Sequence, residues 1–333
     1  MRHWNSARRA SAVCASTLGL LAGSCAVAPE PAPRRTLRIA ATFLLVGDPV
    51  RETLARAIHA SLPDVDVRLQ RTERVAHNLG APAIPDRLGF LGAVQRGEVD
   101  IALSGADAVY LASVGGLEGQ GALFDRLRGI ALLQTRPMYL LVRPGSPVAS
   151  VEALRGHRIG LGSRDSGNGV VSRLVLEAFG LNDGDFEWVP LGTAERVKHV
   201  ADGAVDATFL VDAYPSSDVM GARRRGARLL PVAGHAVDRL RHDYPFFRPF
   251  VISAVAREDV AVQTVGLDTM LLCRSDLDEA LVHAVTKAFF GALPELSSLE
   301  PSFRYVDLLQ APATPIPLHA GAALYYRERE LAR

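Results

Sequence analysis

The chain has 333 residues, 48% of them hydrophobic, and a formal charge of +1. This is enough apolar material for a large core, most naturally divided into two lobes. A near-neutral charge, mixed along the sequence, argues against nucleic-acid binding and against a polybasic membrane-binding face.

Residues 1–28 are typical of an export signal, since three arginines and no acids accompany an apolar run at residues 10–21. The run is too short for a permanent membrane span. Small residues then lead into Cys25, which resembles a bacterial lipobox and predicts a periplasmic protein held at the membrane by lipid on Cys25. Cleavage near Ala26 or Ala28 without lipidation is the alternative. Subtracting the three leader arginines from the charge of +1 leaves −2 for the exported chain.

Residues 29–35 (PEPAPRR) are predicted to form a short, stiff, polar linker. Of the three cysteines, Cys14 leaves with the leader and Cys25 is lipidated or lost. Cys273 remains alone in the apolar run MLLC, where we expect a buried, unreactive thiol.

Beyond the linker, short apolar strands alternate with amphipathic helices, the pattern of a wound α/β domain. We expect a strand at residues 37–41, a helix at 49–60 and a second strand at 65–69. A helix at 87–95 then leads into the strand segment GEVDIAL at residues 97–103.

The GxVD element that turns a helix into a strand occurs twice, at residues 97–100 and 203–206. Each copy is followed by an acid in the next loop, Asp107 or Asp212, and the repeat predicts two lobes of like topology. Because ligands of open α/β sheets lie outside the carboxyl ends of the strands, both loops should face a shared cleft.

Between the copies, strands are expected at residues 130–133 and 138–142, separated by residues 134–137. The second of these strands is the candidate for the first crossing between lobes. The chain should return near residues 250–255, after which a strand at 260–273 and a helix at 276–293 rejoin the first lobe. The predicted division is lobe 1 at residues 36–138 plus 255–333 and lobe 2 at residues 139–254.

Residues 157–181 read as a strand, a polar glycine-rich turn and a helix closed by Gly180. The free N–H groups and dipole at such a helix start can hold a carboxylate or phosphate. Capping of the helix by Ser166 or Asn168 is the alternative role. A P-loop is excluded because Asn168 stands where a lysine is required, and Asp165 replaces the third glycine of a dinucleotide fingerprint. No cofactor is therefore expected.

The sequence shows no constellation typical of an enzyme. Its nine histidines have no metal-site spacing, and no G-x-S-x-G elbow is present. We expect neither a metal nor catalysis.

Several segments together resemble the TAXI-type solute receptors of TRAP transporters. They are the LRG-x-R-I-x-L-G run with its following helix, GEVDIAL, the crossing at residues 130–143, TVG at 264–266 and PIPLHAGAALYYRE at 315–328. The resemblance covers residues 37–328.

The resemblance implies an extracytoplasmic binding protein with an α/β, two-lobe, periplasmic-binding-protein-like fold, a hinge and an interlobe cleft. It implies capture of a small, usually acidic solute such as glutamate or 2-oxoglutarate, and delivery to a TRAP-type membrane permease. Arg136 is the candidate positive partner of the acid, and a salt bridge from Arg136 across the hinge to Asp107 or Asp212 is its alternative role. The candidate ligand-binding residues are Thr42, Phe43, Asp107, Arg136, Ser163, Ser166, Gly167, Asn168, Asp212 and Tyr214.

Three features depart from the family pattern. The loop at residues 42–48 is mostly apolar, Arg136 stands where an acid commonly precedes Pro137, and residues 73–85 look like an insertion. They leave open a second function, in which the chain is a sensor or scaffold that signals to a membrane partner.

Overall fold

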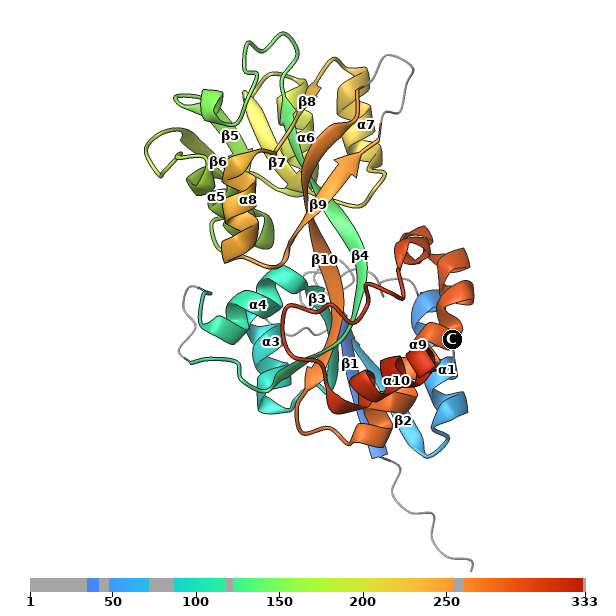
Figure 1. The fold of residues 1–333 in the computed structure, drawn as a ribbon. Coiled ribbons are helices and arrows are strands. Elements are labelled where there is room, and N and C mark those ends of the chain that lie inside the picture. The colour runs from blue at the N-terminus through green and yellow to red at the C-terminus, as the bar shows by residue number, and fades with distance from the viewer. Residues whose placement is uncertain (1–34, 42–47, 72–86, 118–121, 254–259, 332–333) are drawn as a thin grey trace, which may run out of the picture. The chain divides into compact units, whose positions relative to one another are not determined.

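The structure is a computed structural model that describes residues 35–41, 48–71, 87–117, 122–253 and 260–331. In this part of the chain ten strands form one mixed sheet with helices on both faces (Figure 1). The predicted leader, Cys25, the linker up to residue 34, and the loop with Thr42 and Phe43 lie outside the described residues, as does the expected insertion at 73–85. No helix in the described ranges is long and apolar enough to cross a membrane.

The first half of the sheet has the strand order β2-β1-β3-β10, in which β2, β1 and β3 are parallel and β10 is antiparallel. Its elements are β1 (Arg35–Ala41), α1 (Asp48–Ser61), β2 (Val65–Arg71), α3 (Arg87–Arg96), β3 (Ile101–Gly105), α4 (Ala106–Val114), β10 (Val262–Arg274), α9 (Glu279–Leu299), the 3₁₀ helix η2 (Pro301–Tyr305) and α10 (Ala320–Leu331).

The second half repeats this order as β6-β5-β7-β4, with β6, β5 and β7 parallel and β4 antiparallel. Its elements are β4 (Leu127–Val142), the 3₁₀ helix η1 (Glu152–Leu154), β5 (Arg158–Leu161), α5 (Gly167–Ala178), β6 (Glu187–Pro190), α6 (Thr193–Ala201), β7 (Ala207–Val211), α7 (Ser217–Arg224), β8 (Arg228–Leu230), α8 (His235–Asp243) and β9 (Phe247–Ile252).

The long strands β4 and β10 pair with each other and run through both halves (Figure 1). The expected interruption between two strands at residues 134–137 is therefore wrong, because β4 is continuous. Pro137 is the last β4 residue paired with β10, and Met138 is the first paired with β7, so the proline falls where the strand changes partner. The predicted lobe boundary after residue 138 lies inside β4, and the one at 254–255 lies outside the described residues. Both boundaries stay predictions.

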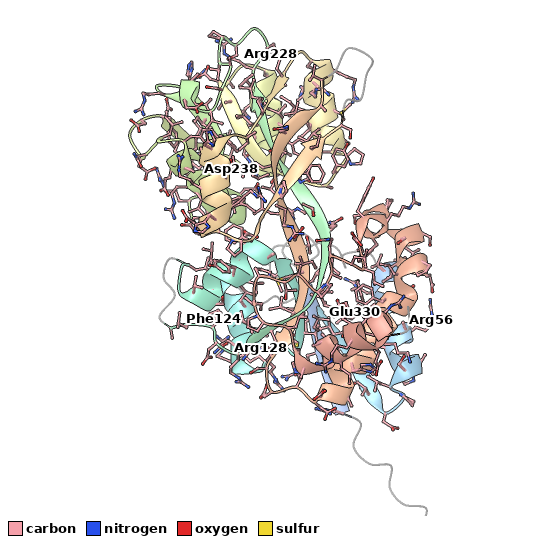
Figure 2. All side chains as sticks on the ribbon, in the orientation of Figure 1. Arg56, Phe124, Arg128, Arg228, Asp238 and Glu330 are labelled. Carbon is pink, nitrogen blue, oxygen red and sulfur yellow. The ribbon has the colours of Figure 1, made fainter. Side chains whose placement is uncertain are left out.

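Three apolar clusters fill the layers between the sheet and its helices. One joins α3, α4, α5 and α8 to one face, a second joins α1, α9 and α10 to the first half, and a third joins α6 and α7 to the second half. Cys273 is fully buried in the second cluster, as the sequence predicted. Charged residues such as Arg56, Asp238 and Glu330 lie on the outer faces of α1, α8 and α10 (Figure 2).

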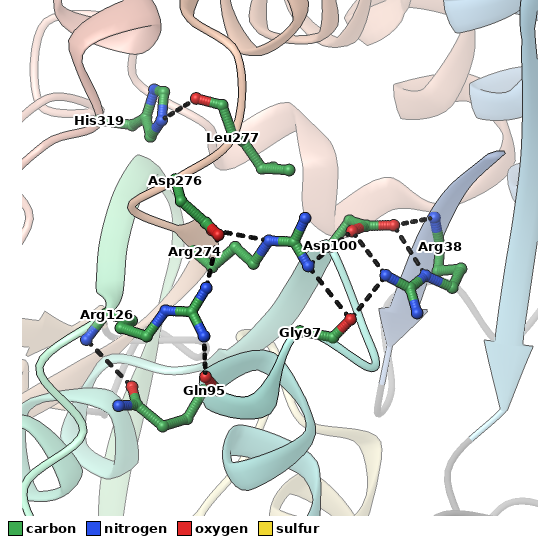
Figure 3. A network of polar contacts seen from close by, with 9 residues as sticks. All are labelled: Arg38, Gln95, Gly97, Asp100, Arg126, Arg274, Asp276, Leu277 and His319. Carbon is green, nitrogen blue, oxygen red and sulfur yellow. Dashed lines mark hydrogen bonds and ion pairs between the residues drawn. The ribbon is translucent and has the colours of Figure 1, made fainter. Parts of the chain in front are cut away.

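The two GxVD segments form the same polar contact in the two halves of the sheet. In the first half, Asp100 accepts from the backbone N–H of Arg38 at 2.8 Å and from its Nε at 3.0 Å, and Arg274 of β10 pairs with the same carboxylate at 3.3 Å (Figure 3). Arg38 also donates to Gly97 O.

In the second half, Asp206 accepts from the backbone N–H of Arg158 at 3.0 Å and from its Nε at 3.3 Å. Arg143 of β4 pairs with Asp206 at 3.1 Å, and Arg158 reaches Gly203 O. The sequence repeat therefore marks equivalent positions, with β4 in the second half corresponding to β10 in the first.

Candidate functional site

The turn that enters α5 is folded tightly on itself. The Ser166 hydroxyl caps the helix by accepting from Gly169 N at 3.1 Å, and it donates to Ser163 O at 2.7 Å. A Cβ on Gly162 or Gly169 would collide with Ser166 Oγ or Ser163 O, so both positions require glycine. The capping role expected for Ser166 is confirmed.

Capping leaves the first amides of α5 for another partner. Within the described ranges, the N–H groups of Gly167 and Asn168 have no hydrogen-bond acceptor, as expected for the first turn of a helix. These groups and the positive end of the helix dipole favour an anion at this position.

Asn168 and Arg136 meet at the end of β7. Asn168 Oδ1 accepts from Val211 N at 2.7 Å, and Arg136 Nη2 donates to Val211 O at 3.2 Å. Arg136 belongs to β4 and Asn168 to α5. The backbone of Val211 therefore connects the crossing strand to the start of the helix through two hydrogen bonds. The guanidinium of Arg136 is thereby brought beside the glycine-rich turn.

Two carboxylates act on Arg136. Burial lowers the pKa of the Arg136 guanidinium, whereas the charges of Asp107 and Asp212 raise it. Asp107 lies buried in the first turn of α4, and Asp212 accepts from Ser216 Oγ at 2.7 Å just after β7. Arg136 thus lies in the field of one acid from each half of the sheet, and both roles expected for it stay predictions.

The other candidate residues are placed as follows. Ser163 and Gly167 belong to the same turn as Ser166. Tyr214 packs edge-on against Phe250 with ring centroids 5.2 Å apart, and its hydroxyl accepts from Ser253 N at 3.2 Å. The Tyr214 side chain is thus directed to β9, while Thr42 and Phe43 lie outside the described residues.

Two buried polar residues near Asp212 escaped the sequence reasoning. Arg196 on α6 donates to Phe209 O at 2.9 Å and to Thr193 Oγ1 at 3.0 Å. Burial lowers its pKa to about 10, while the charge of Asp212 raises it. Tyr139 donates to Ala213 O at 2.9 Å, and burial together with Asp212 raises the pKa of its hydroxyl. In the sequence, Arg196 directly follows Glu195, which accepts from Gly192 N at the start of the amphipathic helix α6. Nothing in this local pattern distinguishes Arg196 from a solvent-exposed arginine.

Among the described residues no group of three His, Cys, Asp or Glu side chains could hold a metal ion. The arrangement therefore consists of directional N–H donors, the guanidinium of Arg136 and two carboxylates whose charges act on it. Such groups bind and orient a small polar molecule.

The profile of the NMT1-like family matches residues 90–329. Among solved structures, the chain is similar to XAC2383 from Xanthomonas citri bound to ATP, with a TM-score of 0.56 and 13% identity over 88% of this chain and 94% of that one.

It is also similar to the periplasmic sulfonate-binding protein SsuA from Methylobacillus flagellatus KT, with a TM-score of 0.50 and 15% identity over 83% of this chain and 74% of the other. A third similar structure is PhnD1 from Prochlorococcus marinus in complex with methylphosphonate, with a TM-score of 0.50 and 14% identity over 90% and 98% of the two chains. At these identities the likeness shows the fold, and it confirms the predicted periplasmic-binding-protein-like class.

Proposed function

Because the chain belongs to the NMT1-like family, and because its fold is that of periplasmic solute-binding proteins, we propose that it captures a small anionic solute outside the cytoplasm. The solute is a carboxylic acid of the glutamate or 2-oxoglutarate type. It is not transformed, since binding itself is the function.

The observation that carries this proposal is the convergence of Arg136 and the start of α5 on Val211. A carboxylate there would accept from the amides of Gly167 and Asn168 and from the guanidinium of Arg136. Charge-assisted hydrogen bonds of this kind are roughly twice as strong as neutral ones. The similar proteins bound to ATP and methylphosphonate, and the sulfonate-binding one, also take anions, which supports an acidic ligand.

The proposed mechanism is closure of two lobes about β4 and β10. The charges of Asp107 in one half and of Asp212 in the other both act on Arg136. A ligand that contacts both halves favours the closed arrangement over the open one by its difference in affinity for the two.

The resemblance to TAXI-type receptors supports delivery of the solute to a TRAP-type permease, with the protein anchored through lipid on Cys25. The second candidate, a sensor or scaffold that signals to a membrane partner, is favoured by the altered loop at residues 42–48 and by Arg136 in place of an acid. Loss of uptake in a strain lacking the chain supports transport, whereas intact uptake with a lost response to the acid supports the sensor.

The binding proposal is tested by thermal denaturation of the purified protein with 2-oxoglutarate, glutamate and related diacids. A ligand at about 100 times its dissociation constant adds roughly 2.7 kcal/mol to the free energy of unfolding, which raises the melting temperature by several degrees. Arg136→Ala should remove this increase, and Arg239→Ala, which changes an exposed arginine on α8, should keep it. The proposal is contradicted if only neutral solutes raise the melting temperature. It is also contradicted if acids raise the melting temperature of Arg136→Ala as much as that of the wild type.

A further inference from the structure

Arg248 of β9 makes two polar contacts beside the register shift of the β4–β10 ladder, which falls between Asp268 and Met270. Its Nη2 donates to Gln310 Oε1 at 2.8 Å, and its Nε lies 3.7 Å from Asp268 Oδ2. Asp268 is 6% exposed and also accepts from Thr135 Oγ1 of β4 at 2.5 Å. The contacts of Arg248 with Gln310 and Asp268 are called the clasp below.

The two ends of the clasp belong to different halves of the sheet. Arg248 pairs with Gly266 of β10, on the second-half side of the register shift. Gln310 lies next to Ala311, whose carbonyl accepts from Leu132 N of β4 on the first-half side. Bending of the paired strands at the shift would therefore change the distance that the clasp spans.

The strand pairing places the clasp on the face of the sheet opposite to Arg136. Paired residues share a face, and successive residues of a strand alternate between faces. Arg136 pairs with Leu267, which belongs to the apolar cluster of α4 and α5. The residues on either side of Leu267 therefore belong to the other face, and these two pair with Arg248 and Thr135.

The surroundings of the clasp agree with this placement. Ala311 belongs to the apolar cluster of α1, α9 and α10, and Phe250, two residues after Arg248, packs against the cluster of α6 and α7. Figure 1 shows α4, α5 and α8 on one side of the two long strands and α7 and α9 on the other. The clasp therefore lies behind these strands as seen from the starts of α4 and α5.

A bend that brings the starts of α4 and α5 together separates groups on the opposite face of the sheet. Closure around a solute would therefore lengthen or break the clasp. A protein whose binding-competent arrangement is only partly populated has an apparent affinity reduced in proportion to that population.

We infer that Arg248 is a positioning residue whose clasp holds the two halves in the open arrangement and thereby lowers the affinity for the solute. The inference rests on the proposed function, because the solute has to favour the closed arrangement. It predicts that removal of a contact far from the ligand strengthens binding.

The test removes one end of the clasp with Gln310→Ala, which truncates an exposed side chain. Titration calorimetry with 2-oxoglutarate should give an affinity at least about threefold higher than that of the wild type. Arg248→Met should give a similar increase, and the double variant should add little to it, because both substitutions remove the same contact. Gln263→Ala, which changes an exposed glutamine of β10, should keep the wild-type affinity.

Small-angle X-ray scattering of the ligand-free protein provides a readout that does not depend on the solute. Gln310→Ala should have a smaller radius of gyration than the wild type, because loss of the clasp increases the population of the closed arrangement. An unchanged or lower affinity of Gln310→Ala overturns the inference even when the acid binds. If 2-oxoglutarate binds neither protein, the proposed function fails and scattering decides alone: a smaller radius supports the clasp, and an unchanged or larger one overturns it.

Discussion

Arg158 donates both its backbone N–H and its guanidinium to one carboxylate, that of Asp206. Arg38 does the same to Asp100 in the other half of the sheet. Each aspartate thereby ties the turn before a parallel strand to an arginine of the neighbouring strand.

Asp206→Asn should lower the free energy of unfolding at neutral pH by about 1–2 kcal/mol. Burial alone would raise the pKa of Asp206, but hydrogen bonds from Arg158 and Arg143 outweigh it and lower the pKa to about 2. The stabilisation is complete above the unfolded pKa of 3.8 and is lost as the pH falls through the folded value. Chemical denaturation of both proteins between pH 2 and 7 should show a difference that disappears at the acid end.

Asp183→Asn is the matched control, since Asp183 pairs with Arg164 at 2.6 Å on the surface. Exposed ion pairs contribute little, so this change should stay within about 0.5 kcal/mol. Equal effects of the two substitutions would refute a special role for Asp206.

His319 should produce a second, separate loss of stability at mildly acidic pH. Its Nδ1 accepts from Gly321 N at 3.2 Å, and its Nε2 lies 3.1 Å from Leu277 O, so the neutral ring fits the site. Burial lowers the pKa of His319 below 6.5. The unfolded chain then binds a proton that the folded chain does not, and stability falls as the pH drops below about 6.5. In His319→Gln the decline over this range should be smaller, and an unaltered pH profile would contradict the prediction.

Glycine-to-alanine substitutions at two positions should have opposite signs. A Cβ at Gly266 of β10 would collide with Thr135 Cγ2, and Thr135 is fixed by donating to Asp268 at 2.5 Å. Gly266→Ala should therefore destabilise the protein by about 1–3 kcal/mol. Gly291 in α9 has nothing within 4 Å of its Cβ position, so Gly291→Ala should stabilise it by up to about 1 kcal/mol. Melting temperatures of both variants measure this, and a neutral or stabilising effect of Gly266→Ala would show that the crowding at Gly266 is unimportant.

Cys273 should resist thiol reagents in the folded protein. It is fully buried, and burial raises the pKa of its thiol, so little reactive thiolate forms. Labelling should be slow under native conditions and fast in denaturant. Fast native labelling would place the thiol at the surface.

Cys25→Ala should release the protein from the membrane fraction, since we propose that the lipid on Cys25 is its anchor. Fractionation of cells expressing each form measures this. Unchanged membrane association would exclude the lipid anchor.

The local patterns of the sequence predict most elements well. The strand, glycine-rich turn and helix around Ser166 were found because each residue type there has a local conformational reason. The equivalence of Asp100 and Asp206 was visible as a repeat, although the arginines that bind them were not.

The crossing strand was harder to predict. The run from Gln134 to Pro137 contains a proline, which lacks the N–H of a strand ladder, and its extended conformation depends on pairing with β10 and β7, which are distant in sequence. The burial of Arg196 was missed for the same reason, because its acceptor at Phe209 is supplied by tertiary packing.

The continuity of β4 and β10 limits how the two halves of the sheet can move. Two independent tethers would allow them to swivel and slide, but two strands hydrogen-bonded to each other resist shear and permit mainly bending across the ribbon. The bend should be centred where the ladder is weakest, at the register shift between Asp268 and Met270 and at Pro137, which lacks an N–H. Bending of the paired strands β4 and β10 would bring the start of α4 toward the start of α5. The geometry of this two-stranded connection thus determines which surfaces of the two halves meet.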